Sequence, residues 1–332
     1  MGANSGSGAM TSGRPAGYVL RPWSGDGDHE AMAAVRRGCA ERDGADPHSV
    51  VEGVPTAAEI AETSAGLENA SGNQVLVEHH GRVVGYATVR WWQERDGTWL
   101  YLHRGHLLPE HRDRGIGSEL VAWAENRIRR LVAEHGTART AVFGANAALA
   151  DADATELLLA TGYRRVFSLV ELELTDLHEL SGHDGARPAG ITIGPVEPSS
   201  YHAVWKTVVD SYADAAFTQK WTFERFVDTA APTCWRAARD GDGIVGVALC
   251  TLRRHDPTVG EVEELSVRAD ARRLGLGRAL LLDGLRCLRE HGARSARLFT
   301  GTANPNRSYD LYESVGFRRR NEYVRYRRPM RS

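Results

Sequence analysis

The feature that most constrains the fold is a short segment, Arg-x-x-Gly-x-Gly, that occurs at Arg112–Gly117 and again at Arg272–Gly277. Each copy follows a predicted strand and precedes a helix with apolar periodicity. Glycines let a ligand approach the backbone closely, and a helix start offers unpaired N–H groups and partial positive charge. The combination predicts an anion site suited to a pyrophosphate. The spacing is neither that of the Rossmann fingerprint nor that of the P-loop.

The surroundings of the two copies indicate that the chain arose by duplication. Val83–Ala87 reads Val-Val-Gly-Tyr-Ala, and Ile244–Ala248 reads Ile-Val-Gly-Val-Ala, with a similar offset to that between the two glycine segments. In both, a glycine falls at the same place in a predicted strand, which indicates a bulge or a close approach. A chain of 332 residues is long enough for two domains.

Periodicity and turn residues predict the same order of elements in each half. We expect strands over 18–23, 74–78, 82–91, 99–108, 140–143, 191–196, 234–239, 244–252 and 261–267, and either one long strand or a pair of strands over 163–174. We expect helices over 28–43, 55–67, 116–132, 154–160, 199–212, 222–229 and from 275 onward. We expect a disordered tail over 1–16, a first domain over 17–175, a polar linker over 176–190 and a second domain over 191–332.

Composition limits the class of protein. The formal net charge of -2 makes nucleic acid an unlikely partner. No apolar run reaches membrane-spanning length, and the polar N-terminus lacks the apolar core of a signal peptide. The four cysteines are scattered without a C-x-x-C pair, and Cys250 and Cys287 lie in apolar patterns. We therefore expect buried free thiols, no metal and a cytoplasmic location.

Both glycine segments resemble motif A of the GNAT superfamily, the acyl-CoA N-acyltransferases, in which Arg/Gln-x-x-Gly-x-Gly/Ala follows the fourth strand. The resemblance covers about Tyr18 to Arg328 and implies a mixed α/β fold of two tandem domains, each a mostly antiparallel sheet flanked by helices. It also implies acetyl-CoA as co-substrate, held at the pyrophosphate by the loop amides. The coenzyme positions implied are Leu265, Ser266, Val267, Arg272, Arg273, Leu274, Gly275, Leu276, Gly277, Arg278 and Asn304 in the second half, and Leu107, Arg112, Arg114, Gly115, Ile116 and Gly117 in the first.

The second half carries candidate catalytic residues. Glu261 lies where many GNAT enzymes place a catalytic carboxylate, and Glu263 is the alternative. Strand alternation predicts that these two share a face with Leu265 and Val267 and that Glu264 points the other way. Desolvation would raise the pKa of such a carboxyl and suit it to accept a proton. Alternatively, Glu261 to Glu264 form a solvent-exposed strand end and have no catalytic role.

The segment from Asn304 to Phe317 resembles the family's motif B, with Leu-Tyr-x-x-x-Gly-Phe at its end. This likeness implies that Tyr312 is the general acid near the CoA sulfur and that Asn304 or Asn306 contacts the pantetheine arm. Tyr309, one turn earlier, is an alternative to Tyr312. Alternatively, Tyr312 is a core aromatic residue on a short helix and has no catalytic role.

The first half departs from these patterns. Leu158 stands where Tyr312 stands in the second half, and Tyr101 stands where Glu261 does. His103 is a candidate base on that strand, or a structural histidine. The asymmetry resembles the mycothiol synthases, tandem GNAT proteins whose second half acetylates a cysteinyl amine while the first half is degenerate. We therefore expect a first half that binds acyl-CoA without catalysing.

These features predict an N-acetyltransferase that moves an acetyl group to a primary amine of a small molecule by direct attack, with Glu261 as base and Tyr312 as acid. We expect a monomer or weak dimer. Two alternatives remain: an acyltransferase with a longer, carrier-bound or tRNA-linked donor, and a non-catalytic acyl-CoA sensor. Retention of Glu261 and Tyr312 together favours the enzyme, because a sensor needs neither.

Overall fold

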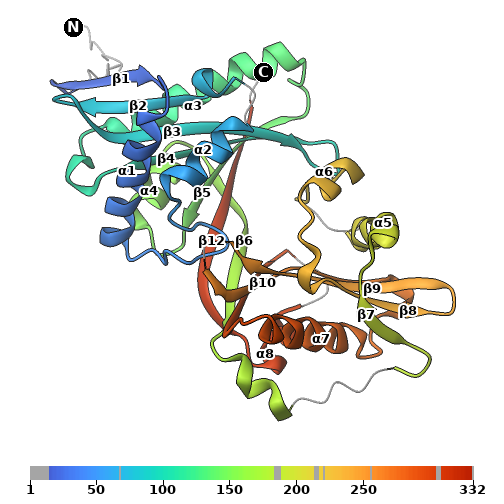
Figure 1. The fold of residues 1–332 in the computed structure, drawn as a ribbon. Coiled ribbons are helices and arrows are strands. Elements are labelled where there is room, and N and C mark those ends of the chain that lie inside the picture. Colours follow the sequence, from blue (N-terminus) through green and yellow to red (C-terminus); the bar gives the residue numbers. More distant parts are fainter. Residues whose placement is uncertain are drawn as a thin grey trace, which may run out of the picture.

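The computed structural model describes residues 15–66, 69–182, 188–212, 217–219, 221–254, 256–303 and 308–330. Nearly all of the expected N-terminal tail, and Asn304 and Asn306 of motif B, lie outside these residues. The strands form one twelve-stranded sheet with helices on both of its faces (Figure 1). The predicted mixed α/β class is confirmed, and the sheets of the two halves are joined into one.

The elements follow the predicted order in each half. The first half contains β1 (Tyr18–Pro22), α1 (Gly27–Asp43), α2 (Ala57–Ala65), β2 (Gln74–His79), β3 (Arg82–Gln93), β4 (Trp99–Leu107), α3 (Ile116–His135), β5 (Ala141–Ala148), α4 (Ala152–Ala160) and β6 (Arg164–Leu174). The second contains β7 (Thr192–Pro195), α5 (Tyr201–Ser211), α6 (Phe223–Asp228), β8 (Arg236–Asp240), β9 (Gly243–Arg253), β10 (Asp256–Val267), α7 (Leu276–Glu290), β11 (Ser295–Gly301), α8 (Ser308–Val315) and β12 (Arg318–Pro329).

Local signals place several of these boundaries. Thr56 caps α2 through a capping box with Glu59, in which each residue's side chain accepts a hydrogen bond from the other's backbone N–H. The predicted close approaches at Gly85 and Gly246 are confirmed. A Cβ at Gly85 would lie 2.8 Å from a side-chain carbon of Leu107, and one at Gly246 would lie 2.9 Å from a side-chain carbon of Leu280.

The two halves exchange their last strands. The sheet order is β1-β2-β3-β4-β5-β12-β6-β11-β10-β9-β8-β7. Strand β12, from the end of the chain, therefore pairs with β5 of the first half, and β6 of the first half pairs with β11 of the second. In Figure 1 the red β12 and the green β6 run side by side through the middle of the molecule. Each half thus completes its sheet with a strand from the other.

Polar contacts reinforce the junction of the halves. Arg297 on β11 lies 2.8 Å from Asp46, which follows α1, and 2.9 Å from Glu173 on β6. Glu171 on β6 is fully buried and accepts hydrogen bonds from the Val50 N–H at 2.7 Å and from Asn321 at 2.9 Å. The segment after α1 is therefore fixed against β11 of the second half.

The start of the expected linker is part of the second half's core. Residues Leu177–Gly182 form a 3-10 helix, and Leu177 and Leu180 are 0% and 2% exposed against α7 and its neighbours. The stretch was predicted as a linker because it is polar overall, although it contains these two core leucines. No helix in the described part of the chain has the length and apolar character needed to span a bilayer.

Candidate active site

The two glycine loops share one backbone conformation. Asp113 and Arg273 have φ angles of 59° and 67°, and Gly115 and Gly275 have φ angles of 79° and 80°. Alternation of right- and left-handed residues turns successive N–H groups toward one side and forms a concave anion site. A Cβ at either glycine would meet no atom within 4 Å, so open space lies in front of both loops.

Internal contacts hold each loop in this shape. The Nε of Arg272 donates to the Val267 carbonyl at 2.9 Å, and the Nε of Arg112 donates to the Leu107 carbonyl at 3.2 Å. Both arginines therefore fold back onto the strand before the loop. Arg112 also forms two hydrogen bonds with Asp43, at 2.7 and 2.6 Å. Its charge is neutralised inside the protein, so the backbone is the part of this loop that is offered to a ligand.

The remaining predicted loop residues divide into two groups. Ile116 and Leu276 are buried, and Gly117 and Gly277 approach Leu157 and Leu311 on the facing helices α4 and α8. Arg114, Arg273 and Leu274 are exposed, and Arg278 donates to Ser314 on α8. The buried and packed residues position the helix that follows each loop. The exposed residues and Arg278 lie around the open side of the loop.

The strand before each loop separates from its parallel neighbour. Strand β10 pairs with β11 only from Val259 to Glu261, although it continues to Val267. Strand β4 likewise pairs with β5 from Trp99 to His103 and continues to Leu107. The sheet is thus split beside each glycine loop, and the edges of β4 and β10 are open to an extended ligand there.

A β-bulge in β10 changes the predicted faces of the glutamates. The pairing with β9 shifts between Val262 and Glu264. Val262, Leu265 and Val267 pack toward α7, whereas Glu263 accepts a hydrogen bond from Thr251 at 3.3 Å on the other face. Thr251 is also the register partner of Glu261. The expectation that Glu261 and Glu263 share a face with Leu265 and Val267 is therefore wrong.

Because a bulge places two residues opposite one, it also overturns the expectation for Glu264. Glu264 lies on the α5 face with Glu261 and Glu263, since the Tyr212 hydroxyl donates to it at 2.7 Å. Figure 1 shows α5 and α7 on opposite faces of these strands. Three carboxyl groups thus lie on one face, where β10 separates from β11.

The carboxyl groups of Glu261 and Glu263 both have raised pKa values. Burial raises the pKa of Glu261, while Arg253, 3.7 Å away, opposes this rise. Although the Glu263 side chain reaches solvent, burial of its carboxyl and the neighbouring charge of Glu261 raise its pKa to about 7. Glu261 therefore ionises first, and its negative charge holds a proton on Glu263.

A buried network around Glu264 was missed in the sequence. Ser266 donates to Glu264 at 2.7 Å, and the hydroxyls of Ser266 and Ser211 lie 2.7 Å apart. Burial raises the pKa of Glu264, and the hydrogen bonds from Ser266 and Tyr212 partly offset this rise. Ser266 was predicted as a coenzyme contact, but its side chain serves this network. The sequence signal for it was weak, because Ser211-Tyr212 at a helix end is a common pattern.

Tyr312 lies on α8 at the same split in the sheet. Its side chain is 8% exposed, and its ring packs edge-on against Phe317. Burial and the nearby charge of Glu264 raise the pKa of its hydroxyl above the usual range. This hydroxyl has no hydrogen-bond partner among the described residues. Tyr309 instead donates to the Thr300 carbonyl at 3.4 Å. A neutral phenol therefore stands near the Glu264 carboxyl group of β10.

A cavity of about 700 Å³ lies in the first half, beside the split between β4 and β5. Its lining includes Gly115, Gly117, His103 and Leu158, and thus the first glycine loop. A cavity of this size therefore lies in the half that was expected to be degenerate. Its walls contain two imidazoles and the Tyr323 phenol, whose hydroxyl donates to Ser49 at 2.8 Å, and Leu158 stands where the second half has Tyr312.

The histidine and tyrosine of β4 have structural partners. The Tyr101 hydroxyl lies 2.9 Å from His135 and 2.8 Å from Thr137, inside the core. His103 Nε2 lies 2.9 Å from the Tyr163 hydroxyl, and burial lowers the pKa of His103 to about 4. His103 is thus neutral near pH 7, with one nitrogen bonded within the protein. These contacts favour the structural interpretation of both residues.

A second cavity, of about 290 Å³, is lined by four arginines and two glutamates. Arg36 donates to the Gly53 carbonyl at 2.8 Å, and Arg104 lies 3.4 Å from Glu52. Arg90 is half-buried and has neither a hydrogen bond nor an ion pair within the described residues. Burial and the nearby Arg104 lower its pKa. This cavity therefore has a local excess of positive charge.

Two splits in the sheet, each beside a glycine loop at a helix start, define an acyl-CoA-binding fold used twice. The model of the acetyltransferase (GNAT) family matches residues 43–150 and 200–317. The chain belongs to this family, and it is an acyl-CoA-dependent N-acetyltransferase with two tandem GNAT domains.

The chain is similar to mycothiol acetyltransferases. It is 31% identical over 228 residues to that of Thermomonospora curvata, covering 67% of this chain and 71% of the relative. It is 28% identical over 320 residues to that of Nocardia farcinica, covering 91% and 95%.

Solved structures share the tandem fold. The GCN5-related N-acetyltransferase from Sphaerobacter thermophilus has a TM-score of 0.77 at 23% identity, covering 96% of this chain and 98% of that one. A tandem GNAT protein from the clavulanic acid biosynthesis pathway has a TM-score of 0.68 at 18% identity, covering 95% and 99%.

Proposed function

We propose that the second half transfers an acetyl group from acetyl-CoA to the primary amine of a small molecule by direct attack. The observation that carries this proposal is the bulge in β10. It turns Glu264 to the face that Glu261 and Glu263 share, beside the split in the sheet and before the second glycine loop. A carboxyl pair, a neutral phenol and an anion cradle then surround the place where an extended thioester would lie.

In the proposed mechanism, the loop amides around Gly275 hold the pyrophosphate, and the open edge of β10 holds the pantetheine arm. Glu261, ionised before Glu263, accepts the proton of the attacking amine. Tyr312 keeps its proton near neutral pH, because its pKa is raised, and donates it to the departing thiolate. Glu263 is the alternative base.

For the acceptor, we propose a cysteinyl amine. The relatives named above are mycothiol acetyltransferases, and the mycothiol synthases that this chain resembles act on such an amine. The segment after α1 supports an acceptor site between the halves, because the Arg253 guanidinium bonds to the His48 carbonyl at 2.5 Å and lies beside Glu261.

We further propose that the first half binds acyl-CoA without transferring the acyl group. The cavity of about 700 Å³ beside the first glycine loop supports binding. Leu158 on α4 argues against catalysis there, because a leucine cannot protonate a thiolate.

The test is native mass spectrometry with acetyl-CoA, combined with a thiol-release assay on a cysteinyl amine. Gly115→Val and Gly275→Val are a matched pair, since both glycines have φ near 80° and open space beyond them. We expect two bound coenzymes in the wild type and one in each variant, with turnover lost only in Gly275→Val. Turnover lost only in Gly115→Val would refute catalysis in the second half. Unchanged melting temperatures would show that the variants fold.

A further inference from the structure

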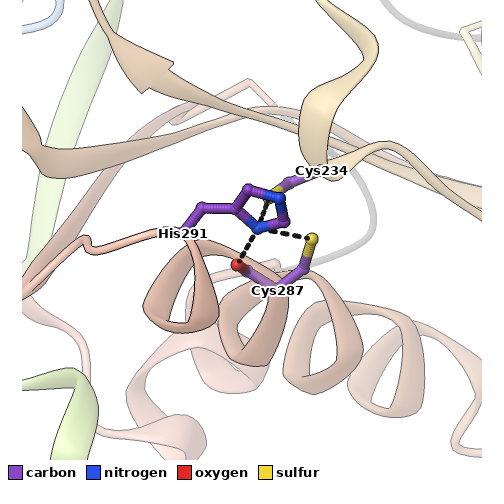
Figure 2. Close-up of side chains that lie close together, drawn as sticks. All are labelled: Cys234, Cys287 and His291. Carbon is purple, nitrogen blue, oxygen red and sulfur yellow. Dashed lines mark hydrogen bonds between the residues drawn. The ribbon is translucent and has the colours of Figure 1, made fainter.

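Three potential metal ligands meet at the end of α7 that is remote from the glycine loop. Cys234 ends the 3-10 helix Pro232–Cys234, Cys287 lies in the last turn of α7, and His291 follows that helix. Figure 2 shows the His291 imidazole directed at both sulfur atoms. Its Nδ1 lies 3.6 Å from the Sγ of Cys234 and 3.6 Å from the Sγ of Cys287.

These distances match those of a tetrahedral zinc site. With Zn–S of about 2.3 Å and Zn–N of about 2.0–2.1 Å, tetrahedral angles separate nitrogen from sulfur by about 3.6 Å. All three ligand atoms lie within 4.8 Å of one another. One ion can therefore reach all three with small side-chain movements.

The surroundings also favour a cation. The last carbonyl groups of α7 carry the partial negative charge of a helix C-terminus. Both cysteines are buried, whereas His291 is exposed, so solvent can supply a fourth ligand. Two thiolates and an imidazole form a donor set that suits zinc better than magnesium or calcium.

We propose that Cys234, Cys287 and His291 bind one Zn²⁺ ion, with a water molecule as the fourth ligand. This site is separate from the acetyl-transfer site and does not depend on the proposed substrate. Little in the sequence points to this site, because Cys234 is far from Cys287 along the chain and only Cys287 and His291 are close in a Cys-x-x-x-His pair.

Binding requires a defined proton balance. Each Zn²⁺ ion replaces two thiol protons, which leave to solvent, and forms two Zn–S bonds and one Zn–N bond. His291 Nδ1 now lies 2.8 Å from the Cys287 carbonyl. On binding, Nδ1 coordinates the metal instead, and the ring proton resides on Nε2, which faces solvent. Without a cation, burial and the neighbouring Cys287 raise the pKa of the Cys234 thiol.

The metal fixes the segment before β8 to the end of α7. That segment connects α6 to β8. Helix α7 has 15 residues and so separates the metal from the glycine loop by about 20 Å. The ion therefore acts on stability and not on acetyl transfer.

The experiment is a Co²⁺ titration of the reduced, chelator-treated full chain, followed by displacement with Zn²⁺. We expect one Co²⁺ per chain, with thiolate-to-cobalt charge-transfer absorption and the intense visible bands of tetrahedral Co²⁺. His291→Ala, at an exposed position, should weaken binding at least about 100-fold. Cys287→Ser should abolish the charge-transfer band or greatly reduce it. Cys39→Ala, which removes a buried thiol of the first half, is the control and should bind normally.

A second readout is the melting temperature, which Zn²⁺ should raise in the wild type and in Cys39→Ala but not in His291→Ala. The proposal is overturned if the reduced protein gives no charge-transfer band. Binding that persists unchanged in both His291→Ala and Cys287→Ser also overturns it. The proposal also fails if Cys234 and Cys287 form a disulfide and the reduced protein binds no metal. That result would assign the pair to redox chemistry instead.

Discussion

The coupling between Glu261 and Glu263 predicts distinct pH–rate profiles for two matched variants. The pKa of Glu263 rises from the usual 4.5 to about 7, partly through the charge of Glu261. About half of the Glu263 carboxyls are therefore protonated at pH 7, and about nine-tenths at pH 6. Ionisation of Glu263 over this range therefore adds one negative charge to the pair.

If Glu261 is the base, Glu261→Gln should lower kcat/KM by about 10²–10⁴ at every pH, which is the usual contribution of general-base catalysis. The same change removes the charge beside Glu263, so the remaining carboxyl should titrate below pH 7. Glu263→Gln should keep most of the activity and lose the titration near pH 7. The assay is thiol release at limiting acceptor amine between about pH 5.5 and 8.5.

Ionisation of the acceptor amine affects the pH–rate profiles of the wild type and both variants in the same way. Differences between the three profiles therefore report the roles of Glu261 and Glu263. Full activity in Glu261→Gln together with loss in Glu263→Gln would move the base to Glu263. Full activity in both variants would refute a carboxylate base. Because the folded pKa of Glu263 exceeds the unfolded one, wild-type stability should fall as pH rises from about 4.5 to about 7, and Glu263→Gln should remove this part of the decline.

Three further changes test separate parts of the structure. Tyr312→Phe should lower turnover with little change in acetyl-CoA affinity, by steady-state kinetics and calorimetry; unchanged turnover would exclude it as the acid. Tyr212→Phe removes a 2.7 Å hydrogen bond to buried Glu264 and should lower the free energy of unfolding by roughly 1–3 kcal/mol in urea titrations; no loss would contradict the network. Arg90→Met should keep or raise the melting temperature, because it removes a half-buried charge without a partner; a clear fall would show that Arg90 has a stabilising contact.

The sequence predicted the elements and glycine loops well because their signals are local. Gly115 and Gly275 occupy left-handed positions that a glycine adopts at low cost, and the capping box at Thr56 needs only neighbouring residues. The helix boundaries follow from such signals. The same logic placed Tyr312 on a short helix after β11.

The faces of β10 could not be predicted in this way. Strict alternation put Glu264 opposite Glu261, but one bulged residue reverses every assignment beyond it. The sequence of β10 carries no glycine at the bulge to mark it. The network of Tyr212 with Glu264 and the cluster of Cys234 with Cys287 join distant segments, so only the tertiary structure brings their atoms together.

The exchanged strands impose an order on biosynthesis. During translation, β5 of the first half has an open edge until β12, the last strand made, reaches it. The first half thus waits for the second with unpaired backbone groups, a state that is prone to aggregation. Because β12 and β6 lie together in the centre of the sheet, a chain that is cut between the halves should yield fragments that are soluble only when they are co-expressed.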